Sequence, residues 1–153
     1  MSLRNQLGDF SSIVCFKAVI TGVEDTLGED GAAVVFIRAG KVRGQKLAND
    51  LGLTGKNPPI EQLAPALDNA VGLNGTRLCR ITKASMEGND VVVETQETVC
   101  SAGEPQGSNR SCTFTLGAVW GALESVTGKK FDGKHTDCVL RGGGSDKFVF
   151  SPV

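Results

Sequence analysis

Residues 100–150 read CSAGEPQGSNRSCTFTLGAVWGALESVTGKKFDGKHTDCVLRGGGSDKFVF, and their hydrophobic spacing divides them into one helix and two strands. Apolar side chains recur at helical spacing from Thr113 to Thr127, and Gly128 is suited to end that helix. Two strands fit Phe131–Leu140 and Lys147–Ser151, with a glycine-rich turn between them. This part of the chain therefore predicts a helix followed by a pair of strands.

The residues before this stretch predict a β-hairpin. Leu78–Met86 alternates imperfectly between apolar and polar side chains, and Val91–Glu97 follows the turn Glu87-Gly-Asn-Asp90. A polar loop, Gly103–Arg110, leads from this hairpin to the helix. We therefore expect the C-terminal part, about residues 76–153, to run hairpin, helix, hairpin.

The front part of the chain, about residues 1–73, is predicted to be helical. Ser11-Ser12 offers an N-cap, and apolar residues recur at helical spacing from Ile13 to Leu27. Gly28 is a plausible end for this first helix.

Three further helices are expected before the hairpin. They cover Glu29 or Asp30 to Ala39, Lys41 to Leu51, and Ile60 to Val71. Gly40 separates the first two of these. The run Ala32–Ile37 is apolar almost all round, so this helix is expected to be buried on more than one side or to line an apolar cavity.

The composition is that of one ordinary globular domain. Of 153 residues, 40% are hydrophobic and 22% are charged. The net charge of −1 argues against a dedicated nucleic-acid binder, which usually has a basic face. No apolar run approaches the ~20 residues needed to span a bilayer, and the polar start Met1–Gln6 lacks the apolar core of a secretory signal. We expect a single cytoplasmic domain.

The last third of the chain resembles the 4-vinyl-reductase domain, also called the predicted hydrocarbon-binding domain. The resemblance rests on Cys100 and Gly103, on the Gly-x-x-x-Gly spacing of Gly117 and Gly121, and on a later set of residues. That set is Cys112, Cys138, Gly143 or Gly144, and Phe148-Val-Phe150. This family shares its wider fold with haem-dependent nitric-oxide sensors and with vesicle-tethering (TRAPP) subunits.

The resemblance implies an α+β fold. N-terminal helices would pack on a four-stranded antiparallel sheet, with one helix between the two strand pairs and an apolar pocket between helices and sheet. The chain departs from the family near Asp146-Lys147, where a second cysteine is often found. The superfold often dimerises through its helices, so a homodimer is also implied.

The cysteines raise the question of a metal site. Cys100, Cys112 and Cys138 would cluster if their strands are neighbours, and His135 could complete a zinc site. No Cys-x-x-Cys motif is present, however, and buried cysteines are common in protein cores. Packing thiols or a redox pair are therefore expected here rather than zinc.

The sequence also suggests pocket residues, and it offers no convincing catalytic group. His135 with Asp137 could form a base, but a lone histidine with no nearby nucleophile is more often structural. The resemblance and the apolar helices indicate the lining of a ligand pocket. The candidates are Cys15, Phe16, Val19, Ile20, Val35, Phe36, Gly117, Trp120 and Gly121.

Three functions are compatible with the sequence. The first is non-enzymatic binding of a small apolar molecule, which would be a hydrocarbon, a lipid or a tetrapyrrole-like compound; no other cofactor is then required. The second is an enzyme or accessory factor in the reduction of a tetrapyrrole vinyl group, but no dinucleotide or flavin motif is present to supply electrons. The third is a dimeric structural or assembly protein that acts through an interface.

Overall fold

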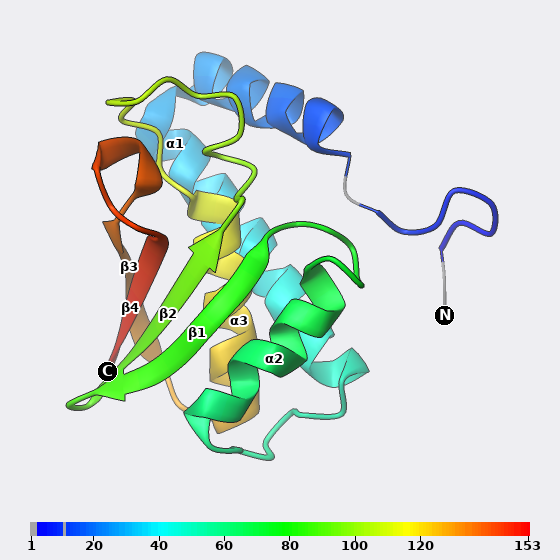
Figure 1. Ribbon diagram of the computed structural model, residues 1–153, viewed down its shortest axis with the longest axis vertical. Coiled ribbons are helices and arrows are strands. Elements are labelled where there is room, and N and C mark those ends of the chain that lie inside the picture. Colours follow the sequence, from blue (N-terminus) through cyan, green and yellow to red (C-terminus); the bar gives the residue numbers. More distant parts are fainter. Residues whose placement is uncertain (1–2, 11) are drawn as a thin grey trace.

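The computed structural model describes residues 3–10 and 12–153 (Figure 1). The predicted cap residue Ser11 lies outside the described residues. The elements, in chain order, are α1 (Ile13–Asp50), α2 (Ile60–Val71), β1 (Arg80–Glu87), β2 (Asp90–Gln96), α3 (Thr113–Thr127), β3 (Phe131–Asp137), the short 3₁₀ turn η1 (Val139–Arg141) and β4 (Asp146–Pro152). Within this part of the chain, no helix combines the length and apolar character needed to cross a membrane.

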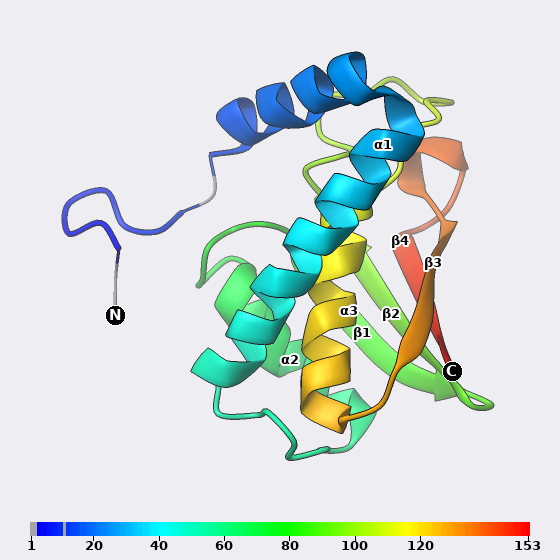
Figure 2. The ribbon, with the colours of Figure 1, turned by 180° about the vertical axis from the view of Figure 1, so that it is seen from behind.

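The four strands form one antiparallel sheet in the order β1-β2-β4-β3. The turn at Gly88 joins β1 to β2, and β4 lies between β2 and β3. Seen from behind, α1 lies in front of α3, and α3 lies in front of the sheet (Figure 2). The predicted α+β fold, with helices against a four-stranded antiparallel sheet and one helix between the strand pairs, is confirmed.

Two predicted boundaries change in the last strand pair and the hairpin. The strand expected over Phe131–Leu140 ends at Asp137, because the carbonyl oxygen of Cys138 accepts hydrogen bonds from the N–H groups of Arg141 and Gly143 and turns the chain. The first hairpin strand begins two residues later than Leu78, whose N–H donates to the carbonyl of Val71 at the end of α2.

The helix α1 is interrupted at Gly28, where the sequence predicts that the first helix ends. Gly28 has φ 76° and ψ 169°, a conformation that glycine adopts without the steric cost of a Cβ. Residues 13–27 and 29–50 therefore form two straight parts that point in different directions (Figure 2).

The predicted end of a helix at Gly40 is wrong. The helix continues from residue 29 to Asp50, and Gly40 faces α3 instead of ending α1. A Cβ added at Gly40 would lie 2.8 Å from the backbone nitrogen of Ala118, which real Cβ atoms essentially never do. The glycine is therefore needed for helix packing.

Four glycines let the backbones of α1 and α3 touch. Gly40 and Gly44 lie one turn apart on α1, and Gly117 and Gly121 lie one turn apart on α3. A Cβ at Gly44 would lie 2.5 Å from the backbone nitrogen of Ala122, and one at Gly121 would lie 2.7 Å from the carbonyl carbon of Lys41. Since α3 also packs on the sheet, it is buried on both sides and forms the centre of the domain.

Candidate functional site

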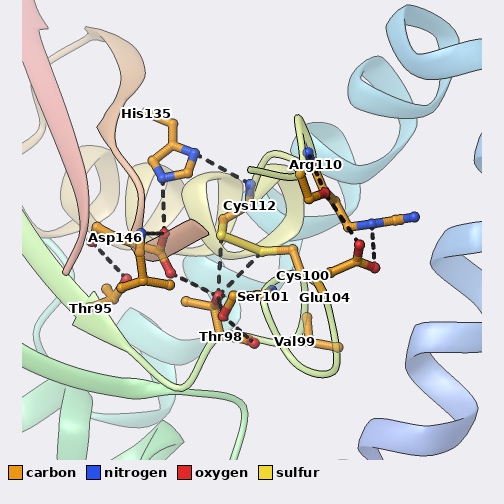
Figure 3. The surroundings of a disulfide bond; sticks show 12 residues. Thr95, Thr98, Val99, Cys100, Ser101, Glu104, Arg110, Cys112, His135 and Asp146 are labelled. Atoms are coloured by element: carbon orange, nitrogen blue, oxygen red, sulfur yellow. Dashed lines mark hydrogen bonds and ion pairs between the residues drawn. A yellow bond between two sulfur atoms is a disulfide. The ribbon is translucent and has the colours of Figure 1, made fainter. Parts of the chain in front are cut away.

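Five chemically reactive side chains meet where the sheet approaches the start of α3. We call Cys100, Cys112, His135, Cys138 and Asp146 the Cys–His–Asp centre. Cys100 follows β2, Cys112 immediately precedes α3, His135 lies in β3, and Asp146 begins β4 (Figure 3). Cys138 follows β3 and contacts the carboxylate of Asp146. Residues up to 46 positions apart in the chain are therefore brought together by the pairing of β2, β4 and β3.

Cys100 and Cys112 form a disulfide bond (Figure 3). Their Cα atoms lie 5.2 Å apart, and both side chains are buried. The two cysteines are 12 residues apart in the chain, and they meet because the loop after β2 folds back to the start of α3. Of the two alternatives expected for these cysteines, packing thiols or a redox pair, the structure has the bonded pair.

Asp146 is the polar centre of this cluster and is fully buried. Its Oδ2 accepts a hydrogen bond from the Thr98 hydroxyl at 3.0 Å, and its Oδ1 accepts one from the N–H of Val139 at 3.3 Å. Nε2 of His135 lies 3.3 Å from Oδ1. Burial acts to raise the pKa of Asp146, but these polar contacts outweigh it and hold the pKa below its ordinary value.

The donor atoms of this cluster suit a transition metal. A sulfur of Cys112, a ring nitrogen of His135 and a carboxylate oxygen of Asp146 all lie within 4.8 Å of one another. Nε2 of His135 is buried, and its only polar neighbour described above, Oδ1 of Asp146 at 3.3 Å, does not meet it with hydrogen-bond geometry. A mixed set of sulfur, nitrogen and oxygen ligands with an unsatisfied imidazole nitrogen fits Zn²⁺.

The sequence named most of this centre but missed Asp146. The position was noted for the cysteine that the family often has there, and aspartate is another common zinc ligand. The proposed ligand Cys138 contacts the Asp146 carboxylate, and burial raises the pKa of its thiol. Cys79, by contrast, lies in the core, where burial raises the pKa of its thiol to about 12 and makes it unreactive.

The loop between the two bonded cysteines holds the first part of α1. Glu104 of this loop forms an ion pair with Lys17 at 2.8 Å, and Arg110 forms one with Glu24. Lys17 also donates a hydrogen bond to the carbonyl of Cys100 at 2.8 Å. Residues 13–27 are thereby attached to the same loop that closes the Cys–His–Asp centre.

A separate apolar cavity of about 460 Å³ lies beside the two parts of α1. It is lined by Leu3, Asp9, Phe10, Phe16, Arg43, Lys46, Asp50, Thr76, Leu78 and Phe114. The rings of Phe16 and Phe114 pack edge to face, with centroids 4.9 Å apart. The guanidinium of Arg77 lies 4.6 Å from the ring centroid of Phe10 and so helps to hold the N-terminal segment beside the cavity.

The predicted pocket residues do not lie together. Phe16 lines the cavity; Ile20 and Phe36 belong to the core. Cys15, Val19 and Val35 are exposed, and Gly117 and Gly121 pack against the backbone of α1. Between the helices and the sheet, where the resemblance implied a pocket, a cavity of about 10 Å³ is lined by residues such as Leu67 and Val119. That volume is about one water molecule.

Trp120 is partly buried and packs against Phe150 of the sheet. It lines a shallow apolar groove along α1 with Val34, Ile37 and Val42. Val34 and Val42 are 70% and 61% exposed, and the ammonium of Lys41 lies 4.5 Å from the Trp120 ring centroid. Exposed apolar residues on the front helices are the feature expected of a dimer interface; dimerisation itself stays a prediction.

Comparison with known proteins identifies the fold. No family model matches the chain, and no curated protein matches it in sequence. One similar structure is the phenol-responsive sensory domain of the transcription activator PoxR, determined with phenol: the TM-score is 0.67 at 17% identity, over 94% of this chain and 75% of that one. The chain shares its fold.

A second similar structure is subunit 3 of a trafficking protein particle complex from Naegleria fowleri, covalently bound to palmitic acid. The TM-score is 0.58 at 11% identity, over 92% of this chain and 95% of that one. The predicted likeness to vesicle-tethering subunits is therefore confirmed for the fold. Membership of the 4-vinyl-reductase family stays a prediction, because sequence identities this low show the fold alone.

Proposed function

We propose that this chain binds a small, largely apolar molecule without transforming it, in the cavity beside α1. The observation that supports the proposal is an open cavity of about 460 Å³ in which three aromatic rings and two leucines line one part and polar or charged side chains line the rest. Sites for small molecules are typically concave, mostly apolar and about 300–1,000 Å³ in volume. The solved structures that share this fold hold phenol and palmitic acid, so the fold can bind apolar molecules in other proteins.

Titration calorimetry with 1-decanol tests this proposal. Wild-type protein is expected to bind the alcohol, and Phe16→Ala is expected to weaken binding about tenfold, because the ring loses its contact with the ligand and with Phe114. Val14→Ala is the matched control, since Val14 lies on the same helix, is 83% exposed and does not line the cavity. Equal affinities for the two variants would contradict the assigned cavity.

We also propose that the Cys–His–Asp centre binds zinc when the Cys100–Cys112 bond is reduced. Cys112, His135 and Asp146 would supply three ligands. Cys100 is bonded to Cys112 and Cys138 contacts Asp146, so either thiol would need to shift toward the other ligands to supply a fourth. Bound zinc would act here as a structural cross-link between the sheet and the start of α3. This centre is distinct from the lining of the apolar cavity.

Zinc content by plasma mass spectrometry tests the second proposal. After reduction, loading with zinc and removal of excess metal, wild type is expected to retain about one equivalent. Removing a residue that only hydrogen-bonds to a metal ligand lowers metal affinity about 10–100-fold. His135→Ala removes a ligand itself, so its zinc affinity should fall by at least that factor. Cys15→Ser is the control, because Cys15 is exposed on α1. Equal zinc retention by His135→Ala and wild type would rule out the site.

A further inference from the structure

The charged side chains around the apolar cavity differ in whether they have hydrogen-bond or ion-pair partners within the protein. Asp9 accepts hydrogen bonds from the backbone N–H groups of Leu3 and Arg4, at 2.8 and 3.0 Å. Asp50 is paired with Lys46 at 3.4 Å, one turn earlier on α1. Both acids and one of the two bases in the lining therefore already have partners within the protein.

Arg43 is the exception. It is partly buried in the cavity lining, and within the described residues its side chain has no hydrogen bond or ion pair. A guanidinium has five N–H donors in a planar fork that matches a carboxylate, and such charge-assisted pairs are among the stronger hydrogen bonds. The side chain is partly exposed and keeps contact with water, and an anionic group on a ligand in the cavity would replace that water with a charge-assisted pair.

We propose that the ligand is an amphiphile with a single carboxylate. This inference rests on the proposed binding function and adds the chemical class of the ligand. The apolar tail lies against Phe16, Phe114 and Leu78, and the carboxylate pairs with Arg43. Lys46 lies one turn from Arg43 on the same helix and adds positive charge at the rim.

The charges of the lining favour one negative charge over two. Asp9 and Asp50 lie in the same lining as Arg43 and Lys46, so the four side chains sum to zero formal charge. A monoanion pairs with the cation of the lining whose side chain has no partner among the described residues, whereas a phosphate dianion would share the lining with two carboxylates and be repelled more strongly. The geometry therefore points to a medium-chain carboxylate, free in solution, as the ligand class.

The experiment compares decanoate with 1-decanol, which have the same chain length and differ in charge. Calorimetric affinities are measured for wild type, Arg43→Gln and Arg38→Gln. Arg38 is the matched control, because it is an exposed arginine of the same helix that does not line the cavity. Wild type should bind decanoate more tightly than decanol. Arg43→Gln should bind decanoate about tenfold more weakly than wild type does and should bind decanol with unchanged affinity. Arg38→Gln should bind both compounds as wild type does.

The other possible results separate a failure of the carboxylate inference from a failure of the proposed function. If wild type binds the two compounds equally, or if Arg43→Gln weakens both equally, the carboxylate inference is overturned and the proposed apolar binding stands. If neither compound binds, the proposed function fails as well. Co-sedimentation of the protein with phosphatidylcholine–phosphatidylglycerol vesicles is measured as well. If the protein binds vesicles but not monomeric decanoate, and if both arginine variants weaken vesicle binding alike, these cations bind a membrane surface. That result would overturn the inference.

Discussion

Replacing Gly44 with alanine is expected to lower the free energy of unfolding by about 3 kcal/mol, the upper part of the range for overpacked cores. The added methyl would lie 2.5 Å from the backbone nitrogen of Ala122 and closer still to the carbonyl oxygen of Ala118. Neither atom can move alone, because both belong to the backbone of α3, which is buried between α1 and the sheet. The two helices would have to separate and lose contacts along their length.

Thermal unfolding measures this effect. For a chain of this size, 3 kcal/mol corresponds to a fall in Tm of roughly 6–12 °C. Gly22→Ala is the matched control, because Gly22 also lies inside α1 and a Cβ there would meet nothing within 4 Å. Alanine is favoured over glycine in a helix by about 0.5–1 kcal/mol, so the control should be slightly stabilised. A Gly44→Ala protein as stable as wild type would show that the backbones of α1 and α3 are not in contact.

Replacing Asp146 with alanine is expected to cost about 3 kcal/mol in the disulfide-bonded, metal-free protein. The fully buried carboxylate accepts hydrogen bonds from Thr98 and from the N–H of Val139, and His135 lies beside it. Removing it leaves these polar groups buried without a partner, which costs about 1–3 kcal/mol for a hydrogen-bonding group and more where a charge was paired.

Urea unfolding in the presence of a chelator measures this cost separately from any effect of zinc. Asp137→Ala is the control, since Asp137 is 50% exposed and its ion pair with Lys147 spans 3.4 Å at the surface. Such a pair contributes about 0–1 kcal/mol, so the control should unfold near the wild-type urea concentration. If both variants lose the same small amount of stability, Asp146 is not the buried hydrogen-bond acceptor described above.

Much of the secondary structure was predictable because its signals are local. The helical spacing from Ile13, the break at Gly28 and the turn at Gly88 each depend on residues close together in the chain. Gly40 shows where such reasoning fails. A glycine inside a helical pattern can end the helix or admit a neighbouring backbone, and residue spacing alone does not distinguish the two.

The candidate sites were less predictable because they are formed by contacts distant in sequence. Cys100, Cys112, Cys138 and His135 could each be named from the sequence, but the partnership of Cys100 with Cys112 depends on how the loop between them folds. Asp146 was seen only as a departure from a cysteine pattern, and its burial follows from the position of β4 in the middle of the sheet. Arg43 gave no signal in the sequence, because lack of a partner is a property of the folded surroundings.

The sequence by itself determined the element types and the α+β class, because hydrophobic period and turn chemistry act over a few residues at a time. The tertiary structure decided where a cavity is left between the packed elements. Gly117 and Gly121 were suggested as pocket residues by their small size, but the backbone of α1 occupies the space beside them. A cavity of about 460 Å³ lies beside Phe16 and Arg43 instead. The physical reason is that close packing fills whatever volume small residues leave, so a cavity is set by all the surrounding elements together and not by any one of them.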